Sequence, residues 1–321
     1  MRYTLLILFS TLCIYSVFGQ EINYLPTSTT KQVIEHQEYT LSYSERHEQA
    51  EWVAYKLSDY EVTSSQERTD NFKEDPQVKT GSASLADYKG SGYDRGHLSP
   101  AADNRINYSA MSESFYLSNM SPQDPSFNRG IWRQLEELVR SWAIEEGNVF
   151  VVTGPILTTI KGSIGPNRVS VPGRYYKIVF DYSGDDEKVI GFILPNEKGV
   201  KELNEYVVTI DNIEAITGID FFPDLPDDQE ESYESRVDPK LWTWTATTIS
   251  CSDGSGKGSA VQCKGIAKST GQRCKNKTTN ENGYCFVHQG QLPGTKQVEK
   301  RANAIRCSAT TQKGTRCKRM T

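Results

Sequence analysis

Cysteine is missing from most of the chain, since none lies between Cys13 and Cys251. A domain of about 230 residues therefore folds without disulfides, and a chain of that length can bury a core large enough to do so. The remaining cysteines crowd the last quarter of the sequence, at Cys251, Cys263, Cys274, Cys285, Cys307 and Cys317. We therefore expect a disulfide-free main domain followed by a separate cysteine-rich region.

Long apolar runs are also absent after the first twenty residues, so no further stretch of the sequence predicts a transmembrane helix. Leu5 to Val17 is almost wholly apolar, but it is too short to span a bilayer as a stable helix, and Arg2 precedes it. Gly19 supplies the small residue of a cleavage site, so residues 1–19 have the pattern of a signal peptide. An uncleaved N-terminal anchor is the alternative. A signal peptide predicts a secreted or periplasmic protein.

Histidine is scarce as well, which limits the kinds of hydrolase to consider. The four histidines are His36, His47, His97 and His288. They form no His-x-x-x-Asp or similar zinc-hydrolase pattern. This argues against a different hydrolase, such as a cell-wall enzyme with a metal-binding tail.

Charge is distributed unevenly along the chain. Residues 257–321 contain fourteen Lys and Arg against two Asp and Glu, a net charge of +12. Because the whole chain carries −5, residues 1–256 carry −17. A basic tail on an acidic body favours contact with a polyanion such as nucleic acid. A solvated basic tail without a partner is the alternative.

Apolar periodicity predicts the elements of the main domain, residues 20–250. Residues 51–57, 148–153, 175–182 and 188–194 have the pattern of strands, the last two forming a hairpin and residues 154–155 a turn. Residues 80–108 are expected to form an ordered loop. The strongest helix covers Phe127 to Glu146, with Ser126 or Asn128 as its N-cap. Its expected apolar face is Trp132, Leu135, Leu138, Val139 and Trp142. Strands before and after one dominant helix favour an α+β domain.

Residue types suited to phosphodiester hydrolysis occur together in the run Tyr93 to His97. His97 can take a proton from water near neutral pH. Arg95 offers rigid bidentate donors for a phosphate, and Gly96 lets the backbone bend so that both side chains face one cleft. Taken alone, this run is equally consistent with a surface histidine in a polar loop.

Further polar residues follow within forty positions, and the helix contains two of them. In a straight helix Asn128 and Glu136 lie roughly 12 Å apart along the axis, so they cannot both bind one metal directly unless the helix bends. An amide oxygen could bind Mg²⁺ while the carboxylate holds the metal's water shell. The alternative makes Asn128 a helix cap and Glu136 a surface residue.

Three motifs in order carry a family resemblance: residues 93–103, 119–123 and 127–136. Together they resemble the DNA/RNA non-specific endonuclease family, the ββα-metal or His-Me finger nucleases that include mitochondrial endonuclease G. The similarity covers roughly residues 50–245. It implies a ββα-metal nuclease fold with a central antiparallel sheet and flanking helices.

The resemblance also implies roles around a metal. His97 is the general base that activates water, and Asn128 is the direct protein ligand of Mg²⁺, with Mn²⁺ as a substitute. Glu136 orders the metal-bound waters, and Asn119 helps to orient the metal site and the substrate.

On the substrate side, the resemblance places Arg95 against the scissile phosphate. Arg68 is the best match for a second, upstream arginine, and Gln123 joins them as a substrate-binding residue. The implied reaction is hydrolysis of DNA and/or RNA with little sequence specificity, leaving 5′-phosphate ends, and the family also implies a homodimer. The competing hypothesis is a catalytically weak nucleic-acid-binding protein that acts through its basic cysteine-rich tail.

The end of the chain predicts a small module after a flexible linker at residues 251–262. Residues 263–290 contain three thiols and one imidazole, a closed tetrahedral set for Zn²⁺. These ligands are Cys263, Cys274, Cys285 and His288. Disulfides are the alternative in an exported protein. Residues 291–321 form a basic tail in which Cys307 and Cys317 partly repeat the module.

Overall fold

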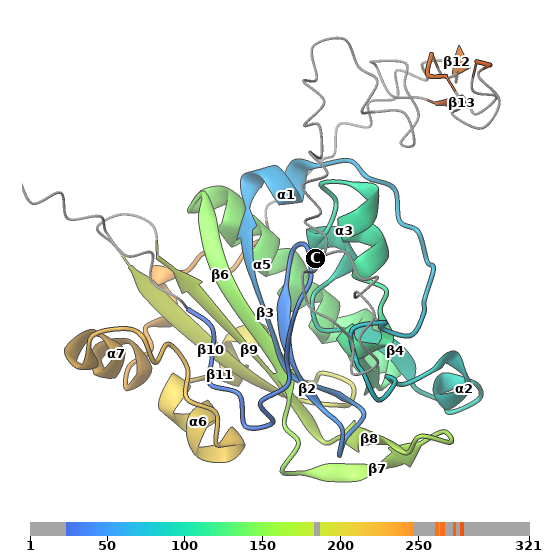
Figure 1. The fold of residues 1–321 in the computed structure, drawn as a ribbon. Coiled ribbons are helices and arrows are strands. Elements are labelled where there is room, and N and C mark those ends of the chain that lie inside the picture. The colour runs from blue at the N-terminus through green and yellow to red at the C-terminus, as the bar shows by residue number, and fades with distance from the viewer. Residues whose placement is uncertain are drawn as a thin grey trace, which may run out of the picture. The chain divides into compact units, whose positions relative to one another are not determined.

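A seven-stranded antiparallel sheet forms the centre of the fold (Figure 1). In order across the sheet its strands are β1 (Val33–Glu35), β2 (Thr40–Ser44), β3 (Gln49–Ser58), β6 (Asn148–Pro155), β9 (Arg174–Asp181), β10 (Lys188–Pro195) and β11 (Val207–Val208). Every neighbouring pair is antiparallel. The expected central antiparallel sheet and its hairpin are therefore confirmed, but β6 continues through Gly154 and Pro155, where a turn was expected.

The computed structural model describes residues 24–182, 187–246, 261–262, 264–266, 272–273 and 277–278. The chain divides into two compact units, residues 1–249 and 250–321. The second contains the short pair β12 (Val261–Gln262) and β13 (Lys277–Thr278). The expected signal peptide and the four cysteine and histidine zinc ligands lie outside the described residues. Within the described part of the chain, no helix is both long and apolar enough to cross a membrane.

Helices, short turns and two further strand pairs make up the rest of the first unit. Its α-helices are α1 (Asp59–Thr63), α2 (Leu85–Tyr88), α3 (Tyr108–Glu113), α4 (Pro125–Phe127), α5 (Arg133–Glu145), α6 (Ile210–Thr217) and α7 (Asp227–Glu234). Short 3₁₀ turns lie at Ala101–Asp103, Leu117–Asn119, Leu203–Tyr206 and Pro239–Leu241. Two further strand pairs are β4 (Asp94–His97) with β5 (Met120–Gln123), and β7 (Ile160–Ile164) with β8 (Val169–Pro172). The expected loop at residues 80–108 thus contains α2 and β4.

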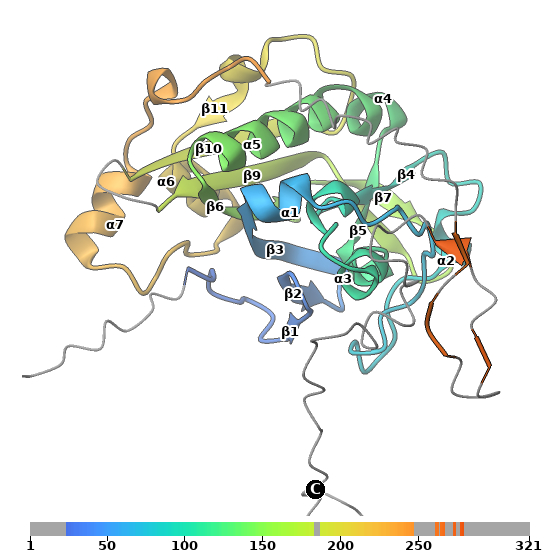
Figure 2. The same cartoon turned by 90° about the horizontal axis from the view of Figure 1, so that it is seen from above.

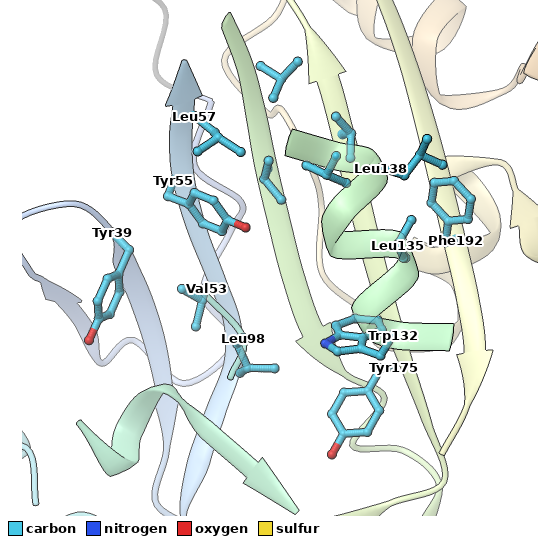
Figure 3. Close-up of a cluster of buried hydrophobic side chains, with 14 of the residues drawn as sticks. Tyr39, Val53, Tyr55, Leu57, Leu98, Trp132, Leu135, Leu138, Tyr175 and Phe192 are labelled. Carbon is cyan, nitrogen blue, oxygen red and sulfur yellow. The ribbon is translucent and has the colours of Figure 1, made fainter. Parts of the chain in front are cut away.

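Side chains alternate between the two faces of the sheet along each strand, so both faces carry buried side chains. Helices therefore cover both faces. Val53 and Val151 pack in one buried cluster with Leu135 of α5. The neighbouring Trp52 packs in a second cluster with Ile213 of α6. Figure 2 shows α5 lying along the strands, and Figure 3 shows its side chains among those of the sheet. The first unit therefore has a helix–sheet–helix arrangement, with α5 on one face and α6 and α7 on the other.

The predicted helix from Phe127 to Glu146 exists, but it is bent. A π-helical turn, Asn128–Trp132, joins α4 to α5, and Gly130 within it has non-helical dihedral angles (φ −106°, ψ −114°). The N-cap is neither Ser126 nor Asn128, as we had expected, but Asp124, whose side chain accepts a hydrogen bond from the Ser126 amide at 2.8 Å. The five residues of the predicted apolar face are all buried.

Candidate active site

His97 is the last residue of β4 and is bordered by two phenylalanine rings. Its ring centroid lies 5.9 Å from that of Phe72 and 5.1 Å from that of Phe115. Its Nε2 atom is buried and has no hydrogen-bond partner among the described residues. An imidazole nitrogen with a free lone pair in an aromatic environment is available to accept a proton.

Two arginines lie over these rings. The guanidinium of Arg95 lies 4.0 Å from the Phe72 centroid, and that of Arg68 lies 4.7 Å from the Phe115 centroid. Burial, followed by the positive charges of Arg68 and Arg95, lowers the pKa of His97 to about 3. His97 is therefore neutral at pH 7, and the three residues expected to act on the phosphate are brought together.

Asn119 is fully buried and holds the backbone that follows His97. Its Oδ1 accepts a hydrogen bond from the Ser99 amide at 2.8 Å, and its Nδ2 donates to the carbonyls of Ser99 and Ser114. Its own carbonyl accepts from the Leu98 amide at 3.0 Å. Because both amide atoms are used in this way, Asn119 positions the His97 segment through the backbone.

Asp94, at the start of β4, orients Asn128 at the start of the π-helical turn. Asn128 Nδ2 donates to Asp94 Oδ2 at 2.9 Å, so Oδ1 of Asn128 is the atom left for a ligand. Arg129 donates to both oxygens of the same carboxylate, at 2.8 and 2.6 Å. Partial burial raises the pKa of Asp94, but the hydrogen bonds from Arg129 and Asn128 outweigh it and keep the pKa below its usual value.

A second carboxylate, Asp103, ties the segment after His97 to α5. It accepts hydrogen bonds from Arg140 NH1 and from the Tyr55 hydroxyl, both at 3.0 Å. In the sequence, His97 lies between the two carboxylates, Asp94 and Asp103. Their partners, Asn128 and Arg140, likewise lie on either side of Glu136. Two buried or half-buried carboxylates therefore hold the histidine strand alongside the helix.

Glu136 lies one helical turn before Arg140 and belongs to a half-buried charged group. Burial raises the pKa of Glu136, while the charges of Arg140 and Lys177 act in the opposite direction. Burial lowers the pKa of Lys177, which is fully buried and lies over the Trp132 ring at 4.9 Å. Neither Lys177 nor Arg140 was predicted from the sequence. The i to i+4 spacing from Glu136 could have identified Arg140, and a lysine at a core-facing position of β9 could have identified Lys177.

Gln123, expected to contact substrate, is instead fully buried in the β4–β5 pair. Its side chain packs on Gly96 so closely that a Cβ at position 96 would lie 2.1 Å from Gln123 Oε1. Glycine at position 96 is therefore needed for a close approach between the two strands.

Comparison with known proteins gives one consistent answer for the first unit. Residues 20–228 match the family described as DNA/RNA non-specific endonuclease. Residues 260–300 match a family described only as a domain of unknown function.

Similar proteins include fungal, human and cyanobacterial nucleases. Nuclease C1 of Cunninghamella echinulata is 37% identical over 61% of this chain and 85% of its own. Human mitochondrial endonuclease G is 35% identical over 60% of this chain and 70% of its own, and a Nostoc nuclease is 32% identical over 71% and 87%. The solved EndoG/EndoGI complex aligns with a TM-score of 0.57 at 31% identity, covering 62% of this chain and 88% of that one. The chain therefore belongs to the DNA/RNA non-specific endonuclease family and is a nuclease.

Proposed function

We propose that the chain is an exported, Mg²⁺-dependent endonuclease that cleaves DNA and/or RNA with little sequence specificity and leaves 5′-phosphate ends. The observation that carries this proposal is a neutral His97 beside Arg68 and Arg95, on a strand tied to the helix of Asn128 and Glu136. Backbone phosphates are the same in every sequence, so arginine contacts to them favour binding without base specificity.

In this proposal His97 acts as the general base. Its buried Nε2 has no competing hydrogen bond among the described residues, so it can accept a proton from an attacking water. The free enzyme keeps the imidazole neutral through burial and the two arginine charges. A bound phosphate compensates those charges, so the affinity of His97 for a proton increases when substrate is present.

Arg68 and Arg95 bind the scissile phosphate. Their guanidinium groups lie over Phe115 and Phe72, which limits the conformations of two otherwise long and flexible side chains. Arginine keeps its charge at every relevant pH and offers planar pairs of donors to phosphate oxygens. The pair therefore supplies fixed positive charge where negative charge increases during the reaction.

The donor set fits a magnesium ion. Asn128 Oδ1 would be the direct protein ligand, because Asp94 takes the amide nitrogen, and Glu136 would accept hydrogen bonds from the metal's waters. A bound Mg²⁺ supplies positive charge that stabilises the leaving oxygen. Arg140 and Lys177 partly offset the burial that raises the pKa of Glu136, and the charge of a bound ion would favour its charged form further.

The basic tail completes the proposal. We assign residues 257–321, with their net charge of +12, to retention of nucleic acid near an acidic enzyme. Zn²⁺ held by three thiolates and one imidazole would fold the first part of the tail. Those ligands are Cys263, Cys274, Cys285 and His288.

A plasmid-cleavage assay tests the catalytic core of this proposal. Purified protein is expected to degrade plasmid with Mg²⁺, and EDTA or His97→Ala is expected to abolish cleavage. His47→Ala is the matched control, because His47 bonds to Ser170 and lies outside the site. Cleavage by the His97→Ala protein at the rate of the His47→Ala protein would contradict the assigned base.

A further inference from the structure

Three carboxylates from α6 and α7 converge on one point. Asp211 and Glu214 lie one turn apart in α6, and Glu234 is the last residue of α7. One oxygen from each lies within 4.8 Å of those from the other two. Asp211 is exposed, Glu214 is half-buried and Glu234 is buried, so the group reaches from solvent into the protein. We call these three residues the acidic triad.

Nothing of opposite charge offsets the acidic triad in the described part of the chain. No ion pair there includes Asp211, Glu214 or Glu234. Glu234 is only 6% exposed, and its Oε1 is buried without a hydrogen-bond partner. Burying a carboxylate oxygen without a partner is unfavourable unless an ion or a proton compensates for it.

The surroundings add to the negative charge. Five of the eight residues of α7 are acidic. The helix also contacts the sheet through Tyr233, whose ring centroid lies 5.3 Å from that of Phe180. Burial, followed by repulsion from Glu214 and other neighbouring carboxylates, raises the pKa of Glu234 to about 9. Without a compensating cation or proton, repulsion among these carboxylates acts against the packing of α7 on α6.

We propose that the acidic triad binds a divalent cation of the calcium type that links α6 to α7. Ca²⁺ takes carboxylate oxygens in flexible geometry and completes its shell with water, which suits three carboxylates open to solvent on one side. Mg²⁺ demands near-ideal octahedral geometry and fits such a site less well. With only three protein ligands, we expect a Kd on the order of 10⁻⁴ to 10⁻³ M.

This site is separate from the catalytic one. The α6 and α7 helices pack on the second face of the sheet, whereas Asn128 and Glu136 belong to the helix on the first face (Figure 1). The family match ends at residue 228, so Glu234 lies beyond it. The cation is therefore expected to stabilise the fold and to take no part in the reaction.

Thermal unfolding of the full chain with and without Ca²⁺ tests the proposal. All proteins carry Asn128→Ala, which removes the proposed catalytic ligand, and are freed of metal with a chelator beforehand. Glu234→Gln removes the buried ligand of the triad. Glu231→Gln is the control, because it removes the same charge from an exposed position on the same helix. Calorimetric titration with CaCl₂ measures binding directly.

At about 10 mM Ca²⁺ the parent and the Glu231→Gln protein should each gain about 3 to 6 °C in Tm. The Glu234→Gln protein should gain less than about 1 °C. If Glu234→Gln does not fold, Asp211→Asn at the exposed ligand replaces it, with the same loss of calcium response expected. An equal calcium shift in the triad variant and the control, or no shift in any protein, would overturn the proposal.

Discussion

At the scale of single residues, we expect the protonation of His97, the proposed general base, to determine the pH dependence of the enzyme. Its pKa is lowered to about 3, first by burial and then by Arg68 and Arg95, so in the free enzyme the base stays neutral as pH falls well below the usual histidine value. A bound phosphate compensates the arginines and raises that pKa. We therefore predict that the acid limb of kcat lies at higher pH than that of kcat/KM, since kcat reports the complex and kcat/KM the free enzyme.

Steady-state rates from pH 4 to pH 8 at constant ionic strength locate the acid limb of kcat and show whether that of kcat/KM falls below pH 4, with circular dichroism confirming that the protein stays folded. Arg68→Gln removes the second cause of the shift, so the limb of kcat/KM should move to higher pH. A kcat/KM limb near pH 6.5 in both proteins would show that burial and the arginine charges do not lower the pKa of His97.

The proposed role of Asp94 follows from its hydrogen bond with Asn128. Asp94→Ala frees the amide of Asn128 to rotate, so we predict that the Mg²⁺ concentration for half-maximal activity rises about 10- to 100-fold. Arg129→Ala is the control, because it removes a partner of Asp94 and leaves the Asn128 hydrogen bond in place. Magnesium titrations that coincide for the Asp94→Ala and Arg129→Ala proteins would show that this bond does not orient the ligand.

At the scale of elements, the sequence predicted the central strands and the buried face of the main helix, because both follow from the local spacing of apolar residues. Strands β3, β6, β9 and β10 were found because apolar residues occupy them, and the buried face of α5 follows from its spacing. The N-cap and the bend of the helix were not found. Asn128 does not cap the helix because the helical stretch begins before it, at Asp124, and its amide instead donates to Asp94, 34 residues earlier in the chain. A contact made by folding cannot be read from the helix sequence alone.

The β4–β5 pair depends on one such contact, between Gly96 and Gln123. A Cβ at position 96 would lie 2.1 Å from a fully buried Gln123 side chain, so we predict that Gly96→Ala lowers the unfolding free energy by about 1 to 3 kcal/mol. Gln123→Ala makes room for the added methyl group. Urea denaturation of both single variants and the double variant measures the coupling. Strictly additive losses would mean that the two side chains do not compete for this space.

At the scale of the whole molecule, two parts of opposite charge share one chain: −17 over residues 1–256 and +12 over residues 257–321. An acidic enzyme repels nucleic acid at long range, and a basic tail raises the local concentration of substrate. We therefore predict that deleting residues 250–321 leaves kcat unchanged but raises KM for DNA at moderate salt. The slope of log KM against log salt concentration should become smaller, because fewer counterions are released on binding.

The tail contributes charge and a proposed zinc fold, and a second variant separates the two. Cys263→Ser with Cys274→Ser in the full chain keeps the net charge and removes two of the four zinc ligands. If charge alone retains substrate, the KM and the salt slope of this double-cysteine variant should match those of the full chain. If the folded module is required, they should match those of the truncated protein. A truncated protein with the KM and salt slope of the full chain would remove the tail from substrate binding. Binding would then depend on the fixed positive charge of Arg68 and Arg95 in the active site.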